Sequence, residues 1–119
     1  MGPEKRFENK IKEYLESKGI WFVKFFANRM TKKGIPDLLA CANGYFIAIE
    51  VKREDGEPSE LQIKKCIDIR LAGGFAFIVY PSGFDKFIQI IDQILDDDRE
   101  VIIAPLIIKE ENNGRNLRY

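Results

Sequence analysis

The chain has 119 residues, of which 45% are hydrophobic and 32% are charged. This composition is typical of a soluble globular protein, and the length predicts one domain with a modest core. No apolar run is long enough to span a membrane and no signal peptide opens the chain, so we expect an intracellular protein. The chain contains no histidine, which excludes catalysis by an imidazole base and removes the usual nitrogen ligands of zinc.

The formal net charge is zero, but the charges are unevenly distributed. Residues 1–35 carry nine Lys and Arg against four Glu, whereas residues 36–119 carry ten against fifteen acidic residues. A basic segment can follow the phosphates of a nucleic acid even in a neutral protein. Two ordinary solvated faces would give the same charge pattern, so charge alone does not choose between these interpretations.

The N-terminal third predicts a helix, a strand and a loop. Residues 4–18 form an amphipathic pattern with an apolar residue at every third or fourth position, and Gly19 follows as a natural stop. Residues 20–27 are rich in aromatic and β-branched side chains, which favours a strand. Residues 28–34 are polar and basic, which indicates an exposed loop.

The middle of the chain predicts a β-hairpin. Residues 38–42 and 45–52 flank Asn43-Gly44, and both segments are mainly apolar. Asn-Gly is the strongest short-range hairpin signal, because a type I′ turn needs positive φ at both central residues. If Ala42 pairs with Tyr45, the same register places Asp37 opposite Glu50.

The second half predicts two helices, each with a strand. Ser59 and Gln62 have capping-box spacing, so we expect a helix from residue 59 to about residue 72. A strand over residues 75–80 follows, and a break at residues 81–83 precedes a third amphipathic helix. That helix ends at the acidic residues 96–98, which we interpret as a solvated helix end.

The C-terminal part contains one more apolar segment, residues 101–108. Pro105 cannot donate to a β-ladder, so this segment is expected at a sheet edge or in contact with a second chain. Residues 109–119 are polar and are predicted to form a tail. The expected order is α-β-β-β-α-β-α-β, a mixed sheet flanked by helices, with one domain over residues 1–108.

Two cysteines, Cys41 and Cys66, lie in apolar patterns without metal-ligand spacing. We expect both to be buried free thiols of a protein in a reducing compartment.

The hairpin register predicts a site for metal-assisted chemistry. Directly opposed residues have Cβ atoms about 4.5–5.5 Å apart, so Asp37 and Glu50 would repel each other without compensation. A hard cation such as Mg²⁺ provides that compensation. Lys52 follows on the face of Glu50 because side chains alternate along a strand. Two carboxylates and a lysine indicate phosphodiester hydrolysis, although turn capping by Asp37, a solvated Glu50 and a simple ion pair of Lys52 are the alternatives.

These residues also carry a family resemblance. Pro36-Asp37 followed by Glu50-Val51-Lys52 resembles the PD-(D/E)xK nuclease superfamily. Residues 34–38, 49–52 and 59–62 together resemble the VRR-NUC family, and the chain is similar to archaeal-type Holliday junction resolvases over residues 7–80. The resemblance implies a restriction-endonuclease-like fold.

The resemblance also implies roles for individual residues. Asp37, Glu50, the backbone carbonyl of Val51 and, directly or through water, Glu8 would hold Mg²⁺ or Mn²⁺. Lys52 would lie beside the attacking water and the scissile phosphate, and Gln62 would lie close to them. Without the resemblance, Glu8 is an ordinary solvated charge on a helix and Gln62 belongs only to the capping box.

The expected activity is that of a Mg²⁺- or Mn²⁺-dependent DNA endonuclease acting on branched DNA such as Holliday junctions. Four basic residues near the site are expected to contact phosphates: Lys24, Arg29, Lys32 and Lys33. A restriction-like or flap nuclease, or a DNA-binding module without catalysis, would share most of these features.

The resolvase resemblance further implies a homodimer, because two strands are cut at positions related by two-fold symmetry. The excess of apolar residues in the segment 101–108 and in the third helix nominates these two elements as dimer surfaces. The expected location is the cytoplasm or nucleoid of a prokaryotic or phage-infected cell.

Overall fold

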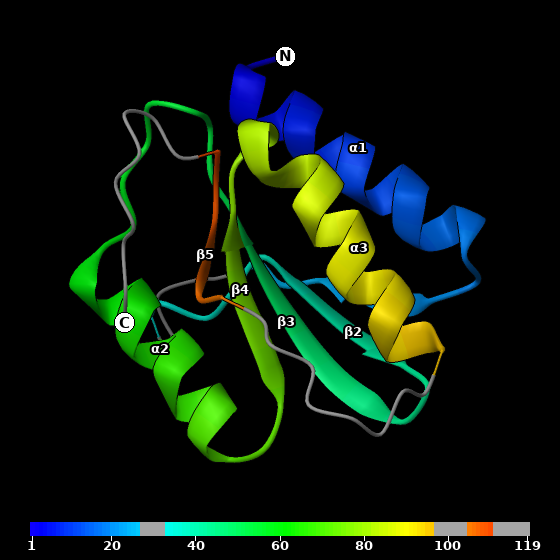
Figure 1. The fold of residues 1–119 in the computed structure, drawn as a ribbon. Helices are drawn as coiled ribbons and strands as arrows, with labels where there is room; N and C mark the ends of the chain where they lie inside the picture. The colour runs from blue at the N-terminus through cyan, green and yellow to red at the C-terminus, as the bar shows by residue number, and fades with distance from the viewer. Residues whose placement is uncertain (27–32, 97–104, 111–119) are drawn as a thin grey trace.

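A computed structural model describes residues 1–26, 33–96 and 105–110 of the chain. Its centre is a mixed sheet whose strands lie in the order in which they occur in the sequence (Figure 1). The first three strands are antiparallel neighbours, and the last two are each parallel to the strand before them. The strands are β1 (Trp21–Lys24), β2 (Leu38–Ala42), β3 (Tyr45–Val51), β4 (Phe75–Val79) and β5 (Ile107–Ile108).

Three helices cover the two faces of this sheet (Figure 1). Helices α1 (Pro3–Ser17) and α3 (Phe84–Leu95) lie side by side on one face, and α2 (Glu60–Leu71) covers the other. A short 3₁₀ turn, Pro81–Gly83, occupies the predicted break before α3. The predicted order of helices and strands, and the mixed sheet flanked by helices, are therefore confirmed.

The core has a layer on each side of the sheet, and β3 takes part in both. Ile47, Ile49 and Val51 point towards α1 and α3, whereas Ala48 packs with Cys66 of α2. Residues on both faces of β3 are buried, as expected for a central strand covered by helices. A charged side chain at the end of this strand therefore lies at the border of a dry interior.

The apolar stripe of α3 is buried inside the domain. Its large apolar side chains are buried against α1 and the sheet: Phe87, Ile90, Ile91 and Ile94. Leu106 and Ile108 are buried as well, and residues 101–104 lie outside the described part of the chain. The described apolar residues of these elements therefore pack largely in the chain's own core, and the expectation that the two elements form dimer surfaces stays a prediction.

The two cysteines differ in their exposure to solvent. Cys66 is buried as expected, but Cys41 is exposed, because α2 leaves that part of its sheet face uncovered. None of the helices in the described ranges is both long and apolar enough to cross a membrane.

The Asn43-Gly44 turn sets the register of the hairpin. Asn43 has φ of 53° and Gly44 has φ of 83°, so both central residues adopt the left-handed conformation that a type I′ turn requires. The paired residues run from Ala42 and Tyr45 to Leu38 and Ile49. The predicted register is confirmed, and one further step along it leads to Asp37 and Glu50.

The C-terminal segment forms the edge of the sheet beyond β4, as predicted. The carbonyl oxygens of Leu106 and Ile108 accept backbone hydrogen bonds from Ile78 and Tyr80 at 2.7 and 3.0 Å. The Lys109 ammonium donates to the carbonyl oxygen of Glu54 at 3.0 Å, so the first residue of the predicted tail still contacts the domain. Residues 111–119 lie outside the described part, and the boundary after residue 108 stays a prediction.

Gly34 allows the loop before β2 to pack against the beginning of α2. Its φ is +83°, and a Cβ atom there would lie 2.8 Å from the carbonyl oxygen of Leu61. This close approach brings the segment that carries Asp37 next to the helix that carries Gln62.

We therefore expect Gly34→Ala to destabilise the fold more than a substitution that is strained only in its backbone. Gly44→Ala is the matched control, because Gly44 has the same φ but no atom within 4 Å of the added Cβ. Both variants incur the cost of a left-handed alanine, about 1–2 kcal/mol, and Gly34→Ala adds a steric cost of about 1–3 kcal/mol. Urea unfolding measures both, and equal losses of stability would contradict the packing argument.

Candidate active site

Asp37 is held at the point where β2 begins, between its two neighbouring strands. Its backbone carbonyl accepts a hydrogen bond from the amide of Phe25 at 2.8 Å, which continues the pairing of β1 with β2. Its Oδ2 accepts a hydrogen bond from the backbone amide of Val51 at 2.8 Å. The carboxylate of Asp37 is thus fixed against the end of β3, beside Glu50.

Glu50 is buried, with 3% of its surface exposed. Its Oε2 accepts a hydrogen bond from Nε2 of Gln62 at 3.1 Å, whereas its Oε1 has no donor among the described residues. Burial raises the pKa of Glu50 to about 9, with further increases from the negative charge of Asp37 and a hydrogen bond to it, while Lys52 acts in the opposite direction. The group is therefore protonated at neutral pH when no cation is bound.

The proton on Glu50 explains the contact between the two carboxyl groups. Two ionised carboxylates only repel each other, and in that state Oε1 of Glu50 is a buried acceptor without a donor. A protonated Glu50 can instead donate a hydrogen bond to Asp37. A divalent cation would replace this proton and satisfy the same oxygen, so the donor set fits a hard metal ion.

Gln62 uses both ends of its amide at this site. Its side-chain Oε1 accepts a hydrogen bond from the backbone amide of Ser59 at 2.9 Å, and the backbone amide of Gln62 donates to the Ser59 hydroxyl at 3.1 Å. These two bonds form the predicted capping box at the beginning of α2. Because Nε2 remains available, Gln62 also reaches Glu50, and the two interpretations of this residue are compatible.

Lys52 follows Glu50 on the same face of the chain. Its Nζ lies 3.8 Å from Oε2 of Glu50, and only 14% of its side chain is exposed. Its backbone amide donates to the carbonyl oxygen of Val79 at 3.0 Å, which holds the residue to β4 immediately after β3 ends. The ammonium is therefore placed beside the carboxylate pair by backbone pairing.

Glu8 approaches the site from α1, on the other side of the sheet. It is 5% exposed, and three ammonium groups surround it: Lys24 at 2.6 Å, Lys5 at 2.9 Å and Lys12 at 3.1 Å. Burial alone would raise the pKa of Glu8, but hydrogen bonds from these lysines outweigh it and lower the pKa to about 2. Glu8 is therefore ionised and already neutralised by the chain.

Lys24 connects Glu8 with Asp37. Its Nζ lies 2.6 Å from Oε1 of Glu8 and 3.5 Å from Oδ1 of Asp37. Burial lowers the pKa of Lys24, but the hydrogen bond to Glu8 and the two nearby carboxylates outweigh it and raise the pKa above its ordinary value. Lys24 therefore carries its charge inside the site.

The structure brings most of the nominated residues together at one end of the sheet. Asp37, Glu50, Lys52 and Gln62 are in contact or nearly so, and Val51 joins them through its backbone amide. Glu8 reaches them only through Lys24. No three acidic or cysteine side chains in the described ranges are grouped closely enough to hold an ion together.

Two of the four residues nominated for DNA contact, Lys24 and Lys33, lie in the described part of the chain. Lys33 is exposed on the loop before β2, whereas Arg29 and Lys32 lie outside the described part of the chain. Sequence reasoning missed that Lys5 and Lys12 neutralise Glu8. Their spacing of three and four residues from Glu8 on a helix was the signal that could have found them.

The pKa of Glu50 predicts an unusual pH dependence of stability in metal-free protein. Between about pH 4.5 and 9 the folded chain keeps the proton that the unfolded chain loses, so the free energy of unfolding should fall as the pH rises. The limiting slope is about 1.4 kcal/mol per pH unit. Glu50→Gln should remove most of this slope, as measured by urea unfolding from pH 5 to pH 8 in EDTA.

Glu60→Gln at the exposed beginning of α2 is the control and should keep the wild-type slope. The absence of histidine leaves few other groups that titrate in this range. Parallel profiles for wild type and Glu50→Gln would show that Glu50 does not carry the proton.

Two comparisons with known proteins match most of the chain. The family model for the archaeal Holliday junction resolvase (Hjc) matches residues 4–103. A solved structure described as a VRR_NUC domain is 26% identical, and the match covers 82% of this chain and 99% of that one with a TM-score of 0.62. No curated protein matches the chain. Since the family model spans most of the sequence, the chain belongs to the archaeal Holliday junction resolvase family.

Proposed function

We propose that the chain is a Mg²⁺- or Mn²⁺-dependent endonuclease that hydrolyses phosphodiester bonds in four-way DNA junctions. Membership of the resolvase family supports a nuclease that acts on branched DNA. The observation that carries the metal dependence is the buried carboxyl of Glu50, which contacts Asp37 and has one oxygen that meets no donor in the described part of the chain.

In this proposal Asp37, Glu50 and the backbone carbonyl of Val51 hold the ion. The ion, when bound, polarises the phosphoryl oxygens and stabilises the leaving oxyanion. Val51 serves the site in two ways, since its amide already fixes Oδ2 of Asp37 at 2.8 Å. Gln62 keeps the Glu50 carboxyl in one orientation through the bond to Oε2.

Lys52 supplies the positive charge nearest to Glu50. Its ammonium can orient the attacking water and offset the negative charge that develops on the phosphate. Only 14% of the Lys52 side chain is exposed, so the ammonium can reach a substrate while most of the side chain is shielded from water. A charge held in such an environment acts more strongly than one in bulk water.

Backbone phosphates outside the reacting bond are bound by the basic stretch of sequence before β2. Lys33 is exposed there, and Arg29 and Lys32 belong to the same stretch of sequence. Such contacts provide affinity and salt dependence with little sequence specificity. Two copies of the chain act on one junction, because a four-way junction is resolved by paired cuts in two strands of like polarity.

A cleavage assay on a four-way junction, a flap and a linear duplex tests the activity. With Mg²⁺ or Mn²⁺ we expect paired nicks in the junction and little cleavage of the duplex. Lys52→Ala should lose at least about 100-fold in rate, because it removes the charge beside the reacting phosphate. Its thermal stability and its affinity for the junction in Ca²⁺ should stay close to those of wild type.

Lys64→Ala is the matched control for this assay, since Lys64 is an exposed lysine on α2 that pairs with Asp68. It should cleave at the wild-type rate. Preference for the flap would favour a flap nuclease, and cleavage of linear duplex alone would reject the resolvase assignment. Binding of the junction without any cleavage would indicate a non-catalytic module.

Metal binding should also be visible without DNA. We expect Mn²⁺ to raise the melting temperature of the wild type, and to raise it more at pH 8 than at pH 6. The reason is that an ion must displace the proton of Glu50, whose pKa is about 9. Asp37→Asn should abolish the gain, as measured by thermal unfolding with and without Mn²⁺. An equal gain in this variant would place the ion elsewhere.

A further inference from the structure

The ammonium group of Lys24 lies between two carboxylates at the edge of the candidate metal site. Its Nζ is 2.6 Å from Oε1 of Glu8 and 3.5 Å from Oδ1 of Asp37. A divalent ion shared by the same two oxygens would lie about 2.1 Å from each of them. Lys24 therefore fills the space where an ion bridging Glu8 and Asp37 would bind.

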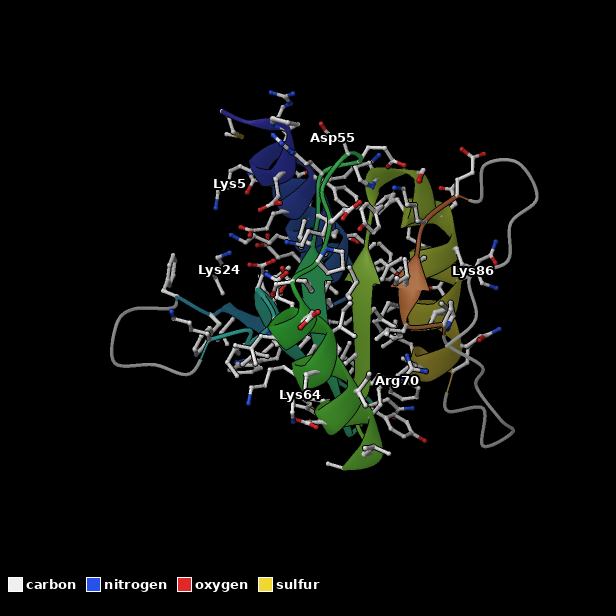
Figure 2. All side chains as sticks on the ribbon, turned by 90° about the vertical axis from the view of Figure 1, so that its left-hand side faces the viewer. Lys5, Lys24, Asp55, Lys64, Arg70 and Lys86 are labelled. Atoms are coloured by element: carbon white, nitrogen blue, oxygen red, sulfur yellow. The ribbon has the colours of Figure 1, made fainter. Side chains whose placement is uncertain are left out.

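Three elements of the fold place this ammonium. Lys24 is the last residue of β1, and strand alternation directs it to the sheet face that α1 covers. Glu8 is buried on α1 at the same end of the sheet. Lys5, which also binds Glu8, lies on the same side of the molecule as Lys24 (Figure 2). The charge of Lys24 is thus held by buried structure rather than by a mobile surface contact.

The acidic residues on the two sides of Asp37 have opposite electrostatic surroundings. Within the described residues, Glu50 has a buried oxygen without a donor, and its only ion pair, to Lys52, is 3.8 Å long. Glu8 has three lysines within 3.1 Å. A divalent cation would gain a ligand at Glu50, whereas the three lysine ammonium groups around Glu8 would repel it. The surroundings therefore favour one ion, on the side of Glu50.

We propose that the site binds a single divalent ion between Asp37 and Glu50, and that the Lys24 ammonium takes the place of a second ion between Asp37 and Glu8. The inference rests on the proposed function only for the position of the first ion. In this arrangement Lys24 is a positioning residue that keeps Oδ1 of Asp37 in place. It also offers a fixed positive charge to DNA phosphate at this side of the site.

Removal of the ammonium should open a second metal site. Lys5 and Lys12 both bind Oε2 of Glu8, so among the described residues the loss of Lys24 leaves Oε1 of Glu8 and Oδ1 of Asp37 free to share an ion. Titration calorimetry with Mn²⁺ at pH 8, without DNA, should give one ion per wild-type chain. Lys24→Ala should bind two, and electron paramagnetic resonance of Mn²⁺ provides an independent count.

Two controls separate this role from a general loss of positive charge. Lys5→Ala removes a lysine that binds Glu8 but makes no bond to Asp37, so it should still bind one ion. Adding Glu8→Gln to Lys24→Ala should return the count to one, because the second ion loses a ligand. Lys24→Met keeps the aliphatic stem of the side chain and should give the same result as Lys24→Ala if the latter folds poorly.

The outcomes distinguish the inference from the function on which it rests. Two ions on the wild-type chain, or one ion on both Lys24 variants, would overturn the role of Lys24 and leave the proposed nuclease intact. No ion on the wild type would overturn both. One ion on wild type and Lys5→Ala, with two on Lys24→Ala and one on the double variant, supports the proposal.

Discussion

The contact between the carboxyl groups of Glu50 and Asp37 is the constraint on which the rest of the site depends. Two acidic groups held together at the end of a buried strand are unfavourable unless a proton or a cation lies between them. The fold maintains this contact with rigid parts: a two-residue turn sets the register, and the Val51 amide holds Asp37. Gln62 then holds Glu50 from α2. The stability of the metal-free chain and the proposed binding of a metal ion would both depend on this one interaction.

Asp37 occupies the boundary between two different ways of neutralising acidic groups. On the α2 side, Glu50 is poorly neutralised by the protein and is suited to an external cation. On the α1 side, Glu8 is neutralised by lysines of the same chain. An enzyme that needs positive charge around a phosphate can obtain it from either source. Here the sheet separates the lysines around Glu8 from the Glu50 carboxyl. The Asp37 carboxylate contacts Lys24 on one side and Glu50 on the other.

Much of the fold could be predicted because its signals are local. Asn43 and Gly44 specify the hairpin turn through positive φ, and the register follows because a shift by one residue would turn every apolar side chain of β3 to the other face. Ser59 and Gln62 mark the beginning of α2 through hydrogen bonds within one helical turn. The opposition of Asp37 and Glu50 follows from the same register and required no long-range information.

Other features depended on which surfaces meet. The apolar stripe of α3 resembles an interface in sequence, because periodicity shows that a face is buried but not against what. Only the packing shows that α1 and the sheet cover it. Cys41 is exposed for the related reason that α2 does not extend over β1 and the adjoining part of β2.

The amino-acid sequence by itself determined the order of helices and strands, the hairpin register, the helix cap and the set of groups available for catalysis, since each depends on neighbouring residues or on composition. The tertiary structure alone decided how charge is distributed among those groups. Glu8 and Lys24 are sixteen positions apart in the chain, and their bond exists because α1 packs under the end of β1. The strength of an electrostatic interaction depends on distance and burial, and both are properties of the folded chain.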